Sequence, residues 1–503
     1  TIDAKAVFTA AENEGFNFEA YRKDYLSTTV DQLFAGSSIG MTNTGNAEEG
    51  GRLGFVGRLK YDYANRYYIE GSFRYDGSDN FAPGHRWGFF PSVAAAWDIT
   101  EEPFFKNLNL KNINLLKLRA SYGTTGTETN VNRFGYLSTY NMVENAVCIG
   151  GNLISGFNEG ALVSPDLLSW YTRRSLNIGI DGSFLDNKLK GSADYFFYVT
   201  KGGLTSPADR YITPLGTKLP QIKSDNEHRR EGFELSLRWS DKIGSDIDYE
   251  IVANMISYRN LWVTNRGEGL SQLKNPYQRN THQSDYLGLY LLDNGLYQSI
   301  EQVLGVPRRP ESTETKLGDI VYQDINGDGK INSEDKVRYG MPIDPHFTYG
   351  VDFLFAYKGF TLSGLFYGTG KRHMMFGVNA RKAESQYVKN KFQLDYWRED
   401  NRNATFPRIS MVAGVNGENN RIESTFYLRN AAFLRLKNLS LIYDFKHKLL
   451  KSAKWLSTCQ VSLTGSNLFT ISGVSDYWDP ETTNTNGGYP TSRIYSLGVT
   501  LGF

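Results

Sequence analysis

The sequence predicts an all-β protein, a transmembrane antiparallel β-barrel with long extracellular loops, on three observations. Aromatic residues make up 14% of the chain, with 32 Tyr, 30 Phe and 8 Trp beside 50 Gly, and Tyr and Trp suit the boundary between lipid and water. Apolar residues alternate with polar ones, and no apolar run approaches the ~18 residues of a membrane helix. Short and long connections alternate between the predicted strands. A large secreted β-sandwich or propeller is the competing interpretation.

Residues 51–76 predict a hairpin that turns near Ala64 and Asn65. One face of each strand is apolar, because side chains of alternate residues point to the same side. That face holds Leu53, Phe55, Leu59, Tyr61, Tyr63, Tyr67, Ile69, Phe73 and Tyr75. The opposite face of the second strand holds Arg66, Glu70, Ser72, Arg74 and Asp76. Such strands fit a wall with lipid on one side and water on the other.

The same alternation recurs at 174–198, 233–239, 349–366 and 495–503, but 431–444 has apolar residues at both parities. Counting these and the intervening segments gives roughly fourteen strands. Charged residues expected to face a barrel lumen are Arg74, Arg119, Asp181, Lys190, Arg238 and Asp352.

The predicted connections fall into two classes of length. Short ones lie near 64–66, 185–188, 241–248, 357–359 and 445–455, with an intermediate one at 98–113. Long, polar ones lie near 12–50, 124–172, 200–230, 260–345, 370–429 and 470–491. Outer-membrane barrels have short periplasmic turns and long extracellular loops, so we expect the long connections to be extracellular.

Composition and motifs argue against catalysis and nucleic-acid binding. The net charge is +1, from 55 Lys+Arg and 54 Asp+Glu, without a like-charge block. The two cysteines cannot build a disulfide framework, and the six histidines are scattered outside any zinc motif. Residues 36–40, GSSIG, match the nucleophile elbow in letters but lie in a polar segment without a nearby histidine. We therefore expect no catalytic residue and no enzyme activity.

Residues 324–335, DINGDGKINSED, have the spacing of a calcium-binding loop. Side-chain oxygens at positions 1, 3, 5, 9 and 12 and the backbone carbonyl at position 7 supply ligands, and glycine at position 6 permits the sharp turn. The predicted ligands of a structural Ca²⁺ are Asp324, Asn326, Asp328, Lys330, Asn332 and Asp335. The alternative is a turn rich in Asx and Gly that holds no ion.

Aromatic side chains in the predicted loops are the candidate ligand contacts, because their faces can stack on sugar rings or on peptide side chains. They are Trp170, Tyr171, Tyr277, Tyr286, Tyr290, Tyr387, Tyr477 and Trp478. The alternative for each is packing within the loops or against a partner protein. Phe503 ends the last predicted strand and resembles the C-terminal signal that the barrel-assembly machinery reads.

Six segments, in order along the chain, resemble the SusC/RagA family of TonB-dependent outer-membrane transporters of Bacteroidetes. They are RYDGSDNFAPGHRWGFFPSVAAAWDITEEPF (74–104), LKLRASYGTTG (116–126), GDIVYQDINGDGKINSEDKVRYG (318–340), FLRLKNLSLIYDF (433–445), TGSNLFTISGVSDYWDPE (464–481) and GYPTSRIYSLGVTLGF (488–503). The chain departs from the family pattern at 281–299, THQSDYLGLYLLDNGLYQS.

The resemblance implies a barrel of about 22 strands filled by an N-terminal plug. Residues 1–503 would then be the C-terminal portion of that barrel, without the plug and first strands, and 260–345 a long extracellular region carrying the calcium-type loop. TIDAKAVFTAA has no signal-peptide pattern, so we expect it to continue a longer polypeptide.

The resemblance also implies function, location and partners. The expected function is TonB-dependent import of an oligosaccharide or oligopeptide across the bacterial outer membrane, within a bilayer that contains lipopolysaccharide. The implied partners are a SusD-like surface lipoprotein that acts as a lid, TonB, and a second transporter–lipoprotein pair. A passive porin and a secreted calcium-binding β-rich adhesion protein are the alternatives.

Overall fold

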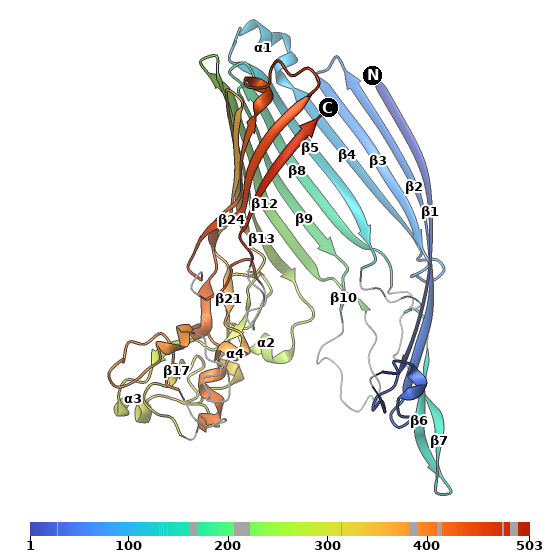
Figure 1. Cartoon of the computed structure of the whole chain (residues 1–503). Coiled ribbons are helices and arrows are strands. Elements are labelled where there is room, and N and C mark those ends of the chain that lie inside the picture. The colour runs from blue at the N-terminus through green and yellow to red at the C-terminus, as the bar shows by residue number, and fades with distance from the viewer. Residues whose placement is uncertain are drawn as a thin grey trace. The chain divides into compact units, whose positions relative to one another are not determined.

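The structure is a computed structural model of the whole chain (Figure 1). It describes residues 1–503 except 28, 130, 132, 134, 138, 160–167, 206–221, 313, 382–390, 410–414, 475–476 and 483–490. The chain divides into unit 1, residues 1–95, 121–175 and 200–225, and unit 2, residues 96–120, 176–199 and 226–503. In the residues described, no helix has the length and apolar character needed to cross a membrane.

Strands dominate the fold, and in the described residues the main sheet has 15 of them. In sheet order they are β1 (Ile2–Tyr21), β2 (Thr42–Tyr63), β3 (Tyr67–Ser78), β4 (Trp87–Asp98), β5 (Ile113–Thr127), β8 (Tyr171–Phe184), β9 (Leu189–Lys201), β12 (Glu227–Ile243), β13 (Ile247–Thr264), β19 (Phe347–Tyr357), β20 (Phe360–Thr369), β23 (Phe433–Asp444), β24 (Thr458–Ser472) and β25 (Ile494–Gly502), while β14 (Gln283–Ser284) pairs with β13 at the side. Neighbours in the sheet are consecutive along this path, and the pairs from β12 to β25 are antiparallel. The predicted all-β antiparallel fold is confirmed, as is the expectation of roughly fourteen strands.

The remaining elements are short and lie in the connections. The two-stranded sheets are β6 (Tyr140–Ile149) with β7 (Asn152–Glu159), β10 (Leu204–Thr205) with β11 (Ile222–Lys223), β15 (Gly288–Tyr290) with β18 (Val337–Tyr339), β16 (Asp293–Leu296) with β17 (Ile320–Tyr322), and β21 (His373–Met375) with β22 (Leu428–Asn430). The α-helices are α1 (Pro103–Asn107), α2 (Leu270–Lys274), α3 (Ile300–Gly305) and α4 (Val378–Arg381). The 3₁₀ helices are η1 (Leu33–Ala35), η2 (Ile99–Glu101), η5 (Ser333–Asp335), η6 (Lys391–Leu394), η7 (Val415–Arg421), η8 (Thr425–Tyr427) and η9 (Phe445–His447).

Tight turns join the strands at one end of each hairpin, which we call the short-turn end. Ala64 and Asn65 between β2 and β3 have φ of 53° and 57°, and Lys358 and Gly359 between β19 and β20 have φ of 45° and 89°. Two successive positive φ angles make the turn whose twist matches the strands it joins. The opposite end of each strand, the long-loop end, carries the longer connections, as predicted.

The two faces of the sheet differ in chemistry. In unit 1, the rings of Tyr75 and Trp87 on one face lie 4.8 Å apart, and in unit 2 Leu497 is 75% exposed on the same kind of face. On β24 and β25 this apolar face carries Leu463, Leu497, Val499 and Leu501, and the polar face carries Ser462, Thr464, Ser496 and Thr500. The predicted two-sided strands are confirmed.

The irregular segment at 431–444 contains a β-bulge. The pairing of β23 with β20 shifts there, because adjacent Leu365 and Phe366 face Asn438 and Leu436, so Lys437 is an extra residue. A bulge changes which parity faces which side. This explains why apolar residues occupy both parities of one strand, and it turns Lys437 toward the side of Arg435.

One predicted connection is much too long. The region expected to be a loop at 12–50 contains strand residues at both ends, because Glu12 pairs with Gly51 and Tyr21 with Thr42. The connection itself is residues 22–41, and the GSSIG segment lies within it. The prediction was wrong because backbone hydrogen bonds extend a ladder past the point where its apolar alternation ends.

Candidate functional site

Three long connections of unit 2 pack around a buried core, and we call this the loop assembly. It comprises residues of 265–346, 370–432 and 473–482, and Phe376 lies at its centre with none of its surface exposed. The Phe376 ring centroid is 5.5 Å from that of Phe406 and 4.3 Å from that of Trp478. The buried core is Leu291, Leu296, Ile320, Tyr322, Ile331, Phe376, Ala380, Trp397, Phe406 and Tyr427.

A buried carboxylate ties distant parts of the loop assembly together. Asp319 accepts hydrogen bonds from Arg408 Nε at 2.6 Å, from Asn420 Nδ2 at 2.8 Å and from the backbone N–H of Lys316 at 2.9 Å. Nearby, the Tyr322 hydroxyl donates to the carbonyl of Asn419 at 2.7 Å. The loop assembly is therefore a folded substructure with its own polar network and not a set of independent loops.

The calcium-type loop at 324–335 is closed by its own side chains. Asp324 accepts from the backbone N–H groups of Gly327 at 2.8 Å and Gly329 at 2.9 Å. Gly329, at position 6, has φ of 79°, a conformation that favours glycine. Buried Asp335 accepts from the N–H groups of Ile325 at 2.9 Å and Asn332 at 2.8 Å.

The predicted ligands therefore share one compact turn. Ile331 within the turn is buried in the core of the loop assembly, which fixes the turn to the rest of the fold. Across the part of the chain that the structure describes, no three His, Cys, Asp or Glu side chains form a ready group for a metal ion. Asp324, Asp328 and Asp335 instead hold backbone N–H groups.

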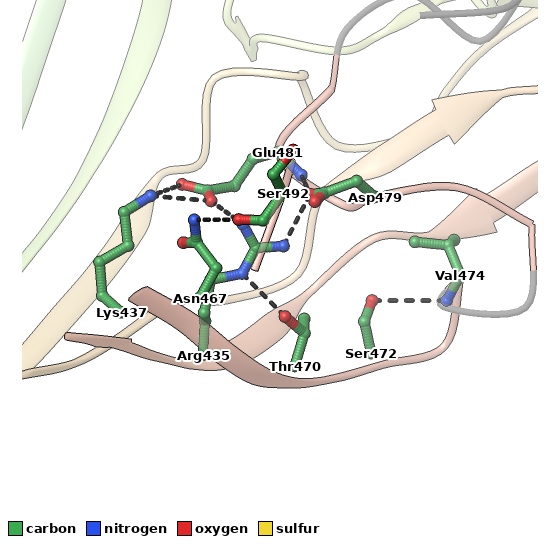
Figure 2. Close-up of polar contacts among 9 residues, drawn as sticks. All are labelled: Arg435, Lys437, Asn467, Thr470, Ser472, Val474, Asp479, Glu481 and Ser492. Atoms are coloured by element: carbon green, nitrogen blue, oxygen red, sulfur yellow. Dashed lines mark hydrogen bonds and ion pairs between the residues drawn. The ribbon is translucent and has the colours of Figure 1, made fainter. Parts of the chain in front are cut away.

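A second polar network lies at the long-loop end of β23 and β24 (Figure 2). Arg435, almost fully buried, donates to Asp479 at 2.7 Å, to Thr470 Oγ1 at 2.8 Å and also to Glu481. Lys437 on the bulge donates to Glu481 at 3.0 Å. Together the two cations hold the segment of the loop assembly that carries Asp479 against the sheet.

The charge of Asp479 is set by competing effects. Burial raises the pKa of the Asp479 carboxyl, but the backbone N–H of Glu481 and the guanidinium of Arg435 outweigh burial and hold that pKa below its ordinary value. This network could not be predicted from the sequence, because Arg435 alternates with Leu434 and Leu436 as any polar-face residue would. The network forms because residues 479–481, over forty positions further along the chain, lie within hydrogen-bond distance of Arg435.

The polar face carries charges on some strands of unit 2 and hydroxyl groups on others. Arg119 on β5 pairs with Asp181 on β8 at 2.7 Å and with Asp194 on β9 at 3.0 Å. Arg238 on β12 pairs with Glu250 on β13 at 2.5 Å. On β24 and β25 the corresponding side chains are Ser462, Thr464, Ser466, Ser496 and Thr500.

Each unit has a hollow on its polar face. In unit 1 a hollow of about 840 Å³ is lined by Lys5, Arg52, Arg58 and Arg74 among others. In unit 2 a hollow of about 460 Å³ is lined by Asp194, Glu234 and Asp352, together with Asn254, Thr348 and Tyr367. Hollows in which a few polar side chains converge can hold a solute or a protein segment.

The predicted aromatic contacts are placed in different settings. Trp170 and Tyr171 are buried within unit 1. In unit 2, Tyr290 is buried, Tyr477 and Trp478 pack against the core of the loop assembly, and Arg338 lies 4.3 Å over the ring of Tyr286. Tyr277 is 55% exposed. Tyr387 lies outside the described residues.

Comparison with known proteins identifies the fold family. The family model described as "TonB dependent receptor-like, beta-barrel" matches residues 6–468. The chain is 27% identical over 535 residues to TonB-dependent receptor P3 of Formosa agariphila, covering 99% of this chain and 50% of that relative. It is 26% identical over 475 residues to TonB-dependent receptor SusC of Bacteroides thetaiotaomicron, covering 90% of this chain and 44% of the relative.

A solved structure has the same fold over the full chain. The RagAB peptide importer in the "open-open" state aligns with a TM-score of 0.78 at 22% identity, covering 100% of this chain and 52% of that chain. The chain spans about half the length of the curated relatives it matches, 50% of one and 44% of the other. The two-faced sheet, the family match and these relatives agree with the predicted resemblance to SusC and RagA: the chain belongs to the TonB dependent receptor-like β-barrel family and is an outer-membrane protein.

Proposed function

We propose that this chain is the C-terminal part of a TonB-dependent importer that carries a polar oligomer, an oligosaccharide or an oligopeptide, across the outer membrane. The observation that carries the proposal is a sheet with an apolar and a polar face, joined at one end to a folded loop assembly. An apolar face suits lipid, and a hollowed polar face suits a hydrated passage. By the rule for outer-membrane barrels, the loop assembly is extracellular and meets the solute first.

The partners follow from the same proposal. A SusD-like lipoprotein would close over the loop assembly, TonB would act through the part of the protein outside this chain, and two such pairs would assemble as a dimer. The structure named as a peptide importer supports a peptide cargo, and the resemblance to the SusC/RagA family implies an oligosaccharide as the other candidate. Both kinds of cargo are polar oligomers, so the hollows of the polar face suit either.

The test is uptake by cells that carry the full-length protein. Labelled oligosaccharides and oligopeptides are offered to wild-type cells, to cells lacking the protein and to cells lacking TonB. We expect uptake of one class, abolished in both deletions. Uptake that survives loss of TonB would support the passive porin, and a protein extracted without detergent would support the secreted adhesion protein. Mass spectrometry of ligand that co-purifies with the protein names the cargo.

Calcium in the loop at 324–335 is part of the proposal. Oxygen donors from three carboxylates and two amides fit a hard cation, and the turn already has its glycine in the required conformation. The ion would be held by Asp324, Asn326, Asp328, the carbonyl of Lys330, Asn332 and Asp335, and it would stiffen the loop assembly.

Calorimetric titration of Ca²⁺ into the full-length protein tests this site. We expect one site that is lost in Asp328→Asn and kept in Glu334→Gln, because Glu334 is exposed and outside the ligand set. Equal calcium binding by the wild type and Asp328→Asn would show that the turn holds no ion there.

Two further predicted sites have direct tests. Tyr277 has the most accessible ring of the described aromatic candidates, so Tyr277→Ala is expected to weaken cargo binding most. Tyr357→Ala is the matched control, because Tyr357 is exposed at the short-turn end of β19 and is not a candidate contact. Phe503 is 82% exposed and stacks on Trp455 at 5.9 Å. If Phe503 is an assembly signal, Phe503→Ala reduces the amount of protein in the outer membrane and Trp455→Ala does not.

A further inference from the structure

Two buried polar side chains at the long-loop end of β20 each carry an atom that has no hydrogen-bond partner among the described residues. Thr369 is the last residue of β20 and is 3% exposed, and Arg372 follows it and is 6% exposed. Among the described residues, nothing hydrogen-bonds to Thr369 Oγ1 or Arg372 Nε. A buried polar group without a partner is costly, and a buried cation is more so. The pair therefore needs an oxygen acceptor.

The neighbouring carboxylates are already engaged elsewhere. Asp479 accepts from Arg435 at 2.7 Å, and Glu481 accepts from Lys437 at 3.0 Å as well as from Arg435 (Figure 2). Burial lowers the pKa of the Arg372 guanidinium, and the fields of Tyr367, Asp344 and Glu481 oppose this effect without a hydrogen bond. Asp344 is exposed to solvent.

The hydrogen bonds give the sign of the missing partner. Arg435 and Lys437 are paired with Asp479 and Glu481, whereas no carboxylate among the described residues hydrogen-bonds to the buried guanidinium of Arg372. Asp344, which acts on Arg372 through its field alone, is exposed to solvent. Buried charges in proteins are paired, so a negatively charged group is the expected occupant.

The position of the pair connects it to the polar face. Thr369 pairs with Thr348 on β19, and Tyr367 occupies the same face of β20 two residues earlier. Thr348 and Tyr367 both line the hollow of about 460 Å³ in unit 2. Thr369 thus lies on the same face, next to the end of that hollow nearest the loop assembly, and Arg372 follows three residues later.

We propose that Arg372 and Thr369 form a subsite for an oxyanion, a carboxylate or sulfate group, carried by the imported solute. The proposal rests on the import function above and narrows its cargo to an acidic oligosaccharide or a peptide with a free carboxylate. A guanidinium binds two oxygens of a planar carboxylate or of a sulfate in parallel, and the hydroxyl adds a third hydrogen bond. The negative side chains deeper in the hollow, Asp194, Glu234 and Asp352, would keep the acidic group at this end.

Anion binding by the full-length purified protein tests the subsite. Sodium sulfate and sodium acetate are titrated at constant ionic strength with sodium chloride as the balancing salt, and thermal unfolding and calorimetry report binding. We expect Arg372→Met to raise the apparent dissociation constant of the bound anion at least tenfold and Thr369→Val to raise it severalfold. Lys371→Met, an exposed neighbouring cation, is the matched control and is expected to match the wild type.

Stability without added anion separates a ligand site from a structural arginine. Replacing an unpartnered buried cation by an apolar side chain of similar size is neutral or stabilising. We therefore expect Arg372→Met to unfold at the wild-type temperature or above in chloride alone, and to lose the stabilisation that sulfate or acetate gives the wild type. A large loss of stability in chloride alone would show that the chain itself supplies the counter-ion, and would overturn the proposal.

Oligomers distinguish the source of the oxyanion. Uronic-acid and sulfated oligosaccharides are compared with peptides that have a free or an amidated C-terminus, and wild type is compared with Arg372→Met for each. Binding of one class, lost in the variant, identifies the cargo. If anions do not bind to the wild type, or bind equally to the wild type and Arg372→Met, the subsite proposal is wrong. The import proposal is not affected by that outcome, because binding is measured without transport. No uptake of any offered oligomer by wild-type cells, with anion binding by the purified protein intact, would instead count against the import proposal.

Discussion

The main sheet and the loop assembly of unit 2 use the same apolar residues in opposite ways. Leu497 on β25 is 75% exposed, and its neighbours on the apolar face share that exposure, whereas Phe376 in the loop assembly has no exposed surface. A surface suited to lipid needs no apolar core behind it, but loops in water must bury their apolar side chains. One chain thus combines an apolar surface suited to lipid with an apolar core suited to water. The transition between these two arrangements lies at the long-loop end of the strands.

The largest expected effect tests the buried side of this comparison. Phe376→Ala removes the ring that contacts Phe406, Tyr427 and Trp478, and such changes cost about 3–5 kcal/mol. We expect the loop assembly to become sensitive to protease while the sheet stays folded in detergent. Leu304→Ala is the control, because Leu304 in α3 is exposed. If both variants resist protease equally, the loop assembly has no cooperative core.

The next effect tests the junction between the two regions. Arg435→Gln leaves Asp479 and Glu481 without their buried cation, and breaking a buried ion pair costs about 3–5 kcal/mol. Hydrogen exchange is expected to rise in the described residues of 473–482. It is expected to change little in residues 458–465 of β24, which lie on the short-turn side of the bulge. Arg398→Gln is the control, since the ion pair of Arg398 with Asp400 lies at the surface. Equal protection of residues 473–482 in both variants would show that this network does not hold the segment against the sheet.

A charge on the apolar face tests the lipid side. Leu463 and Thr464 are neighbours on opposite faces of β24. An arginine on a lipid-facing position costs about 2–4 kcal/mol near the bilayer centre, so Leu463→Arg is expected to lower the folded fraction in lipid vesicles. Thr464→Arg places the same charge on the polar face and is expected to fold normally. The readout is heat-modifiable migration in a detergent gel. If Thr464→Arg lowers the folded fraction more than Leu463→Arg does, the polar and apolar faces have been assigned the wrong way round.

The smallest expected effect concerns pH and the loops alone. Burial raises the pKa of Glu268, but hydrogen bonds from the N–H groups of Thr281 and Asn280 outweigh burial and hold that pKa below its ordinary value of 4.5. A depressed folded pKa gives stability that is present above pH 4.5 and is lost as pH falls through the folded value. Such hydrogen bonds are worth about 1.5–3 kcal/mol.

The measurement is hydrogen exchange at the Asn280 and Thr281 amides, corrected for intrinsic rates, between pH 7 and pH 3. Wild-type protection is expected to fall at the acidic end, whereas Glu268→Gln is expected to show weaker protection throughout and little change with pH. A pH-independent wild type would mean that Glu268 does not secure this turn.

The sheet was predictable from the sequence because apolar and polar residues alternate along its strands with a period of two. The turns at Ala64–Asn65 and Lys358–Gly359 were found for the same reason, since they interrupt that period at a sharp point. The spacing of the calcium-type loop predicted the sharp turn at Gly329, and the bound ion stays a prediction. These signals are all local, and residues close in sequence carry them.

The loop assembly was not predictable, because its contacts are remote. Asp319 and Asn420 are 101 positions apart, and Arg435 and Glu481 are 46 apart. No spacing rule links such residues, and apolar loop residues such as Phe376 look the same whether they contact cargo or form a core. Tyr477 and Trp478 show this directly, since they pack against that core.

The hydrogen bonds that join residues near 320 to residues near 420 also set an order of events during biogenesis. Ile320 and Asn420 are 100 positions apart, with β19 and β20 between them. Closing so long a segment is slow compared with forming a hairpin. The connections would therefore stay open until the adjoining hairpins have formed, so a precursor halted in the periplasm should show protease-sensitive loops beside strands that have already paired.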